Sequence, residues 1–237
     1  MPAIDESRLR AVFSEINMPL SDGQAAQFST YADMLVEKNK VMNLTAVTDS
    51  EGIIIKHFAD SCLPLLMAEI PMNARLIDVG TGAGFPSIPM KIVRPDLKIT
   101  LLDSLNKRVN FLKDVSSALD LSAECIHSRA EDGARISSKT KNVLRETFSV
   151  ATARAVARLS VLSEYCLPYV KSGGRFLALK GSDCMGEIEA AKPIIKELGG
   201  EITGITEYTL PNGDGRTLIV IEKTGSTPGE YPRRVVK

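Results

Sequence analysis

Two kinds of side chain that build metal centres and cross-links are scarce in this chain of 237 residues. Its four cysteines, Cys62, Cys125, Cys166 and Cys184, are widely spaced and form no C-x-x-C pair, and only two histidines accompany them. A structural zinc site needs four such ligands, usually as closely spaced pairs, so the sequence predicts no metal. The cysteines are typical of reduced, buried thiols in a cytosolic protein.

Long apolar runs and targeting segments are also missing. No run approaches the roughly 20 residues that cross a bilayer, and the first residues lack the basic and apolar regions of a signal peptide. No heptad seam indicates coiled-coil assembly. We therefore expect a cytoplasmic monomer that does not enter membranes. With 44% hydrophobic and 24% charged residues, the chain can bury one good core, which favours one α/β domain with an appendage.

A net charge is absent from the whole chain, but the charges are unevenly distributed. The 29 basic and 29 acidic residues balance. Residues 1–70 nevertheless hold five basic and ten acidic side chains, whereas residues 129–180 hold ten basic and four acidic ones. A basic segment of that size can bind a polyanion such as RNA. An ordinary solvated charged surface explains it equally well.

Hydrophobic periodicity divides the chain into a helical start and an alternating remainder. Apolar stripes predict helices over residues 4–16, 21–40 and 51–68, with Ser21 as an N-cap. Strand and helix patterns then alternate, which favours a parallel sheet. The predicted strands cover residues 75–79, 98–102, 123–127, 148–152, 175–179, 201–208 and 217–222, with helices over 86–93, 105–119, 159–170 and 183–198. We thus expect a helical extension over 1–70, a core over 71–223 and a C-terminal surface tail over 224–237, in one structural unit.

Three alternating glycines follow the first predicted strand, in the segment Leu76-Ile-Asp-Val-Gly-Thr-Gly-Ala-Gly-Phe85. Gly80, Gly82 and Gly84 let the backbone turn sharply and approach a ligand where a Cβ would collide. Dinucleotide-binding folds use G-x-G-x-x-G, whereas this chain has G-x-G-x-G. The difference favours S-adenosylmethionine (SAM), which carries no phosphate; a simple tight turn is the alternative. Phe85 packs either on the apolar part of the ligand or between the next helix and the sheet.

Residues at the carboxyl ends of the next strands are further candidates, because ligands bind beyond those ends in an open parallel sheet. Asp103 ends the second strand about 20 residues after the glycines, where an acid accepts hydrogen bonds from both ribose hydroxyls. The alternative is a helix cap by Asp103 or Ser104. After the third strand, backbone N–H groups of residues 128–132 or the Glu131 carboxylate can contact an adenine edge, or the segment only caps a helix.

Two cations stand at the ends of the fourth and fifth predicted strands. Arg154 interrupts an apolar run, and a buried guanidinium without a partner is costly. We expect an anionic or carbonyl partner for it: the SAM carboxylate, a substrate phosphate or a structural acid. Lys180 ends the fifth strand, where a lysine either contacts a ligand or extends into water.

Four segments together carry a family resemblance: Asp78-Val-Gly-Thr-Gly-Ala-Gly-Phe-Pro-Ser-Ile-Pro89, Leu102-Asp-Ser-Leu-Asn-Lys-Arg-Val-Asn-Phe-Leu112, Arg129-Ala-Glu131 and Thr152-Ala-Arg-Ala-Val-Ala157. Over most of its length the chain resembles the RsmG family, formerly called GidB, which methylates guanine N7 in small-subunit ribosomal RNA. The resemblance implies a Rossmann-like class I SAM-dependent methyltransferase, with a seven-stranded, mostly parallel sheet and an N-terminal helical extension. It also implies 16S rRNA or the small ribosomal subunit as the partner. The SAM contacts that it implies are made by Gly80, Phe85, Ala130, Glu131 and Arg154.

The reaction implied by this resemblance requires no general base. Guanine N7 has an in-plane lone pair and no proton, so the protein has to align it with the methyl group. The chain accordingly shows no obvious acid–base dyad, and we predict no catalytic residue. Lys180, Arg158 and Lys107 are assigned to RNA phosphates or to guanine O6. The alternatives are a SAM-dependent methyltransferase with another substrate and a noncatalytic ribosome-assembly protein.

Overall fold

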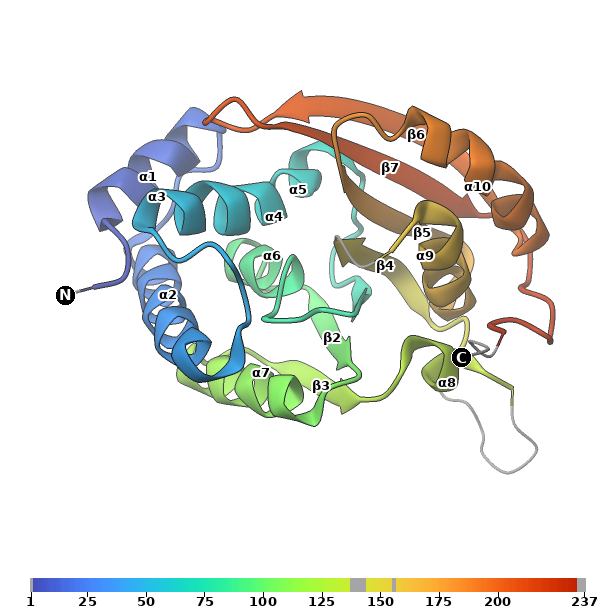
Figure 1. The fold of residues 1–237 in the computed structure, drawn as a ribbon, viewed down its shortest axis with the longest axis horizontal. Coiled ribbons are helices and arrows are strands. Elements are labelled where there is room, and N and C mark those ends of the chain that lie inside the picture. The colour runs from blue at the N-terminus through green and yellow to red at the C-terminus, as the bar shows by residue number, and fades with distance from the viewer. Residues whose placement is uncertain (1, 137–143, 155–156, 234–237) are drawn as a thin grey trace.

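A seven-stranded sheet crosses the molecule in the computed structural model, which describes residues 2–136, 144–154 and 157–233 (Figure 1). The strand order is β3-β2-β1-β4-β5-β7-β6. The first five strands in this order, β3, β2, β1, β4 and β5, pair in parallel. β7 lies antiparallel between β5 and β6. The sheet is therefore mostly parallel, as predicted. The strands are β1 (Arg75–Val79), β2 (Lys98–Asp103), β3 (Ala123–His127), β4 (Phe148–Arg154), β5 (Val170–Gly181), β6 (Gly200–Thr209) and β7 (Gly215–Lys223).

The start of β5 is where the structure differs most from the strand prediction. β5 begins at Val170, which we expected to end a helix. Helix α9 (Leu159–Cys166) instead stops before Pro168, and one turn of 3₁₀ helix, η2 (Leu167–Tyr169), leads into the strand. Proline has no N–H to continue the helix, which explains the early end.

Helices cover both faces of the sheet (Figure 1). Alternate residues of β1 enter two hydrophobic cores, because side chains alternate along a strand: Leu76 enters one core, and Ile77 and Val79 enter the other. The first core also contains residues of the N-terminal helices and of α6 (Ser87–Val93) and α7 (Asn106–Ala118). The second contains residues of α8 (Ala130–Ala134), α9 and α10 (Met185–Glu197).

The N-terminal segment starts with two well-capped helices, α1 (Glu6–Glu15) and α2 (Asp22–Met42). The Ser21 side chain accepts from the Gln24 N–H and the Gln24 side chain accepts from the Ser21 N–H, a capping box that confirms the predicted N-cap. The helix expected over 51–68 is a series of short pieces around one π-helix. Those pieces are α3 (Ser50–Gly52), the π-helix η1 (Ile53–Ala59), α4 (Asp60–Cys62) and α5 (Pro64–Met67).

Side-chain hydrogen bonds attach α2 to the sheet layer. Gln24 donates to the carbonyl of Ile92, Gln27 donates to that of Leu119, and the buried Tyr31 hydroxyl donates to that of Ala83, 2.6 Å away. The extension therefore shares its core with the sheet. No helix among the described residues is long and apolar enough to span a membrane.

The described part of the C-terminal segment, residues 224–233, packs against the protein through some of its side chains, and residues 234–237 of the expected surface tail lie outside the described residues. Thr227 and Tyr231 are buried, with 6% and 5% of their surface exposed. Arg145 lies under this segment and donates hydrogen bonds to three of its main-chain carbonyls, those of Thr227, Pro228 and Tyr231. It also donates to the carbonyl of Ala134, at the end of α8. We call residues 224–233 the C-terminal strap.

Candidate active site

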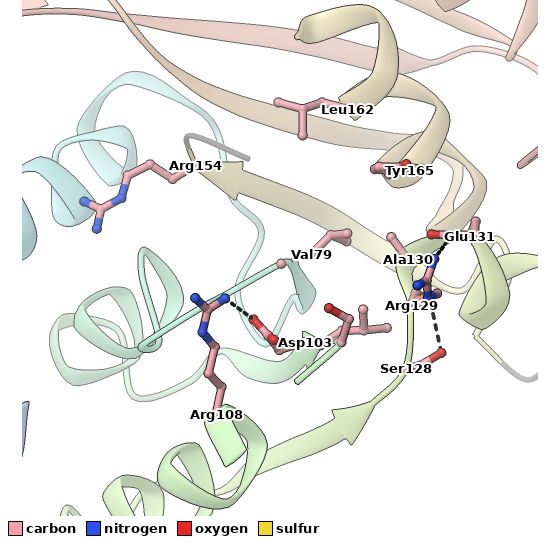
Figure 2. A pocket seen from close by; sticks show the side chains of 13 residues that line it. Val79, Asp103, Arg108, Ser128, Arg129, Ala130, Glu131, Arg154, Leu162 and Tyr165 are labelled. Carbon is pink, nitrogen blue, oxygen red and sulfur yellow. Dashed lines mark hydrogen bonds and ion pairs between the residues drawn. The ribbon is translucent and has the colours of Figure 1, made fainter. Parts of the chain in front are cut away.

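A pocket of about 610 Å³ opens at the carboxyl edge of the sheet (Figure 2). It lies beyond β1, β2 and β4, where the strand order reverses between β1 and β4. Ligands of open α/β sheets bind at this kind of switch point. Its volume is within the range of pockets that hold small molecules. We call it the first pocket.

The glycine turn forms one wall of the first pocket. All three glycines have positive φ angles, 72° at Gly80, 62° at Gly82 and 110° at Gly84, and only Gly80 lines the cavity. A Cβ on Gly82 would meet no protein atom within 4 Å, whereas one on Gly84 would lie 2.7 Å from the Tyr31 hydroxyl. Gly84 is therefore needed for the packing of α2 against the turn.

Asp78, which precedes the glycines, holds the turn from beneath. Its side chain is fully buried, and Oδ2 accepts hydrogen bonds from the Thr81 hydroxyl (2.8 Å) and the Ser87 N–H (3.1 Å). Burial raises the pKa of Asp78 to about 7, because the charged form is poorly solvated there. Asp78 thus stabilises the turn and does not line the first pocket.

Asp103 lies in the opposite wall and is 2% exposed. Oδ2 accepts from the Gly82 N–H at 3.0 Å, and Oδ1 accepts from the Leu105 N–H at 2.9 Å. The Arg108 guanidinium lies 3.6 Å from Oδ2 (Figure 2). Asp103 thus supports the start of α7, whereas the side chain of Ser104 caps no helix. A carboxylate has about four acceptor positions, so Asp103 retains capacity for further donors.

The segment after β3 closes another side of the first pocket. Ala130 and Glu131 begin the short helix α8, and both line the cavity. Glu131 is 7% exposed and pairs with Arg129 at 3.3 Å (Figure 2). Leu162 and Tyr165 of α9 also line the pocket, and sequence analysis missed both. They lie in an apolar stripe of the kind found on any helix packed on a sheet, so the sequence pattern does not mark them as pocket residues.

Arg154 ends β4 and points away from Asp103, toward the helical extension (Figure 2). Its Nη1 donates to the Lys56 carbonyl (3.1 Å) and the Ser61 hydroxyl (3.2 Å) and lies 3.4 Å from Oδ2 of Asp60. Of the partners that the sequence left open, a structural acid and a carbonyl are present. Burial lowers the pKa of Arg154, and Asp60 opposes that shift.

Phe85 joins the helical extension to the glycine turn. It is 7% exposed, its ring stacks on the His57 ring with centroids 4.6 Å apart, and the Arg154 guanidinium lies 4.9 Å from its centroid. The structure therefore places Phe85 in an aromatic cluster behind the first pocket.

A second pocket of about 400 Å³ adjoins the first, and Arg154 lines both. Of the three cations assigned to substrate, only Lys180 lines it; its Nζ pairs with Glu187 at 2.7 Å and donates to the Ala157 carbonyl. Lys107 and Arg158 are exposed and line neither pocket. Lys56 and Arg216 line the second pocket, and sequence analysis did not select them.

The basic segment 129–180 is not one continuous cationic surface. Within its described part, Arg175 pairs with Glu69, and Arg145 is engaged under the C-terminal strap. Arg129, Arg135 and Lys180 likewise have acidic partners. Lys139 and Lys141 lie outside the described residues. The charge count therefore does not by itself define an RNA surface.

The sheet order, the glycine turn after β1 and the acid that ends β2 define the class of protein. This is the fold of class I SAM-dependent methyltransferases. The chain belongs to the rRNA small subunit methyltransferase G (GidB) family, whose model matches residues 24–210. Members of this family are SAM-dependent rRNA methyltransferases.

Curated relatives match over nearly the whole chain. A ribosomal RNA small subunit methyltransferase G from Lactobacillus delbrueckii subsp. bulgaricus is 48% identical over 93% of this chain and 92% of its own length. The protein of that name from Staphylococcus carnosus is 47% identical, over 93% and 91%.

Solved structures share the fold at low identity. A predicted O-methyltransferase, protein Atu636 from Agrobacterium tumefaciens, has a TM-score of 0.55 at 18% identity, covering 70% of this chain and 81% of its own. TYW2 from M. jannaschii, in complex with AdoMet, has a TM-score of 0.55 at 13% identity, covering 75% and 79%. Among the described residues, no cluster of three or more histidine, cysteine, aspartate or glutamate side chains could hold a metal ion.

Proposed function

We propose that this protein transfers the methyl group of SAM to N7 of a guanine in 16S rRNA. One observation carries the proposal: a pocket at the carboxyl edge of a class I methyltransferase sheet adjoins a cationic pocket, and one arginine lines both. Family membership supports small-subunit rRNA as the substrate. The small ribosomal subunit also makes the cytoplasm the expected location, and we expect the chain to act there as a monomer.

The residues of the first pocket fit the nucleoside half of SAM. The Asp103 carboxylate can accept from both ribose hydroxyls, and the Gly80 backbone lets a ligand approach without a Cβ in the way. Gly82 holds Asp103 in place through its N–H. Ala130 and Glu131 lie where an adenine edge is expected.

The amino-acid half of SAM then extends toward Arg154. Nη1 of this arginine is engaged with the helical extension, and its remaining N–H groups are available for the SAM carboxylate. Phe85 and Gly84 support this end from behind, since both pack against Tyr31.

SAM supplies an electrophilic methyl group on a sulfonium centre. The protein's task is alignment, because guanine N7 already presents a lone pair and needs no deprotonation. The acids that line the two pockets, Asp60, Asp103 and Glu131, each lie within 4 Å of an arginine. Burial lowers the pKa of His57 to about 4, so this histidine is neutral at pH 7. Acids paired with arginines and a neutral histidine favour binding and orientation of the ligands rather than proton transfer.

The direct test is methyl transfer to small ribosomal subunits isolated from cells that lack this modification. The purified protein and labelled SAM should place label on one guanine of 16S rRNA, identified as 7-methylguanosine by mass mapping. Subunits that already carry the methyl group are the matched control and should take up no label. Label on another molecule would support the rival substrate. Absence of SAM binding would support the assembly-protein alternative.

A further inference from the structure

The second pocket is built by parts of the chain that are far apart in sequence. The π-helix η1 contributes Lys56 and His57, α4 contributes Asp60, and the facing edges of β5 and β7 contribute Lys180 and Arg216. Arg216 pairs in register with Gly181, so the antiparallel strand β7 returns a cation to the edge where the parallel strands end. π-Helical turns frequently occur at functional sites.

Arg154 is the boundary between the two pockets. The second pocket shares this lining residue with the first. Methyl transfer requires the acceptor atom within about 3–3.5 Å of the methyl group. An acceptor held in the second pocket is therefore next to the donor.

The charges of the second pocket favour an anion. Asp60 is 4% exposed and fixes the two arginines, with Oδ2 3.4 Å from Arg154 and 3.3 Å from Arg216. Lys56 and Lys180 pair with Asp214 and Glu187, whose side chains are 38% and 25% exposed. Neither acid lines the second pocket, whereas all four cations do. A phosphate then meets four cations and one buried carboxylate.

His57 supplies a different kind of contact in the same wall. Its ring stacks on Phe85, and Nε2 is 2.8 Å from the Thr45 hydroxyl. Nδ1 is buried and has no hydrogen-bond partner among the described residues. His57 lines the second pocket, so its ring can contact a base bound there.

We propose that the second pocket holds the target guanosine nucleotide, with its phosphate on Arg216 and Lys180 and its base against His57. Its volume of about 400 Å³ is within the range of small-molecule sites. The helical extension is then part of the substrate site. The proposal deepens the function proposed above and rests on it for the identity of the nucleotide. Asp60 is a positioning residue that holds Arg216 toward the phosphate.

The first test uses the two histidines of the chain as reporters. Guanosine 5′-monophosphate is titrated into protein saturated with S-adenosylhomocysteine, and the histidine side-chain NMR signals are followed. His57 lines the second pocket, whereas His127 contacts the Ser104 carbonyl beside the first. We expect the His57 signal to move and the His127 signal to stay. Movement of His127 alone, or of neither signal at millimolar nucleotide, would overturn the proposal.

The second test compares two arginines at opposite ends of the β5–β7 pair. Arg216→Gln removes a proposed phosphate contact, and Arg175→Gln removes an arginine opposite Glu222 at the far end. We expect Arg216→Gln to raise KM for unmethylated subunits about tenfold, as for one lost charged hydrogen bond, while the affinity for SAM and the melting temperature stay near wild type. Arg175→Gln should leave KM unchanged.

The outcomes separate this proposal from the function on which it rests. If wild-type protein methylates 16S rRNA and Arg216→Gln does so with wild-type KM, only the pocket assignment is wrong. If wild-type protein transfers no methyl group to subunits, the proposed function is wrong, and the histidine signals still report whether the pocket binds a nucleotide.

Discussion

Asp103 combines a structural contact with a proposed ligand contact in one carboxylate. Its oxygens accept the N–H groups of Gly82 and Leu105, and the same side chain lines the first pocket. The two alternatives that the sequence left open, a ribose contact and support of the next helix, are therefore compatible. A buried acid in this position is held rigidly, which favours recognition of two adjacent hydroxyls.

Asp103→Ala should weaken SAM binding about 10- to 100-fold, the loss expected for one or two charge-assisted hydrogen bonds. Isothermal calorimetry measures the affinity. Asp114→Ala, at an exposed position of α7, is the control and should bind SAM like wild type. Unchanged affinity in Asp103→Ala would contradict the ribose role.

His57 makes the stability of the protein sensitive to acid. Burial and the nearby Arg154 lower its pKa from 6.5 to about 4. Between those values the unfolded chain binds the proton and the native state does not, so the free energy of unfolding falls as the pH drops. The full effect is up to about 3 kcal/mol.

Urea unfolding at pH 7 and pH 4.5 tests this expectation. His57→Gln should show a smaller loss of stability on acidification than wild type. His127→Gln, which changes the other histidine of the chain, should lose as much stability as wild type does. Equal acid sensitivity in all three proteins would show that His57 does not titrate as described.

Among the elements, the glycine turn contains two glycines that look equivalent in sequence but have different surroundings in the structure. Gly82 faces space free of protein atoms, whereas Gly84 lies against Tyr31 and Ile88. Gly82→Val should retain the fold apart from about 1–2 kcal/mol of backbone strain, and lose SAM affinity by tenfold or more because the strained turn displaces the N–H that holds Asp103. Gly84→Ala should lower the free energy of unfolding by about 2–5 kcal/mol through strain and overpacking.

Chemical denaturation and calorimetry on the two glycine variants distinguish these effects. Wild-type SAM affinity in Gly82→Val would mean that the turn is not the cofactor site. Wild-type stability in Gly84→Ala would mean that α2 does not pack on the turn as the structure shows.

The C-terminal strap depends on one arginine beneath it. Arg145→Ala removes four hydrogen bonds to main-chain carbonyls, so we expect a loss of about 2–5 kcal/mol in stability and faster hydrogen exchange in residues 224–233. Lys171→Ala, at an exposed position of β5, is the control and should change neither. Unaltered exchange in the strap would contradict its anchoring by Arg145.

Over the whole molecule, local patterns predicted the elements better than the contacts between them. Strand β1, the glycine turn and Asp103 could be predicted from hydrophobic periodicity and from the chemistry expected at strand ends. The structure brings Gly80 and Asp103 into one pocket. The wall formed by Tyr165 and the return of Arg216 on β7 depend on how distant segments pack. No spacing within either segment encodes that packing, so sequence reasoning missed both residues.

The partner of Arg154 shows the same limit. The sequence indicated that a guanidinium in an apolar run needs an anion or a carbonyl, and the structure supplies Asp60 and the Lys56 carbonyl from the helical extension. Residues 1–70 are therefore packed into the site region rather than attached to its outside. This arrangement is the reason that the second pocket exists.

The central claim is that the glycine turn and Asp103 hold the nucleoside half of SAM at the carboxyl edge of the sheet. A crystal structure of the protein grown with excess SAM tests it most directly. We predict density for the donor in the first pocket, with both ribose hydroxyls within hydrogen-bonding distance of the Asp103 carboxylate and the adenine beside Ala130 and Glu131. Donor bound elsewhere, or a first pocket filled by protein side chains, would contradict the account.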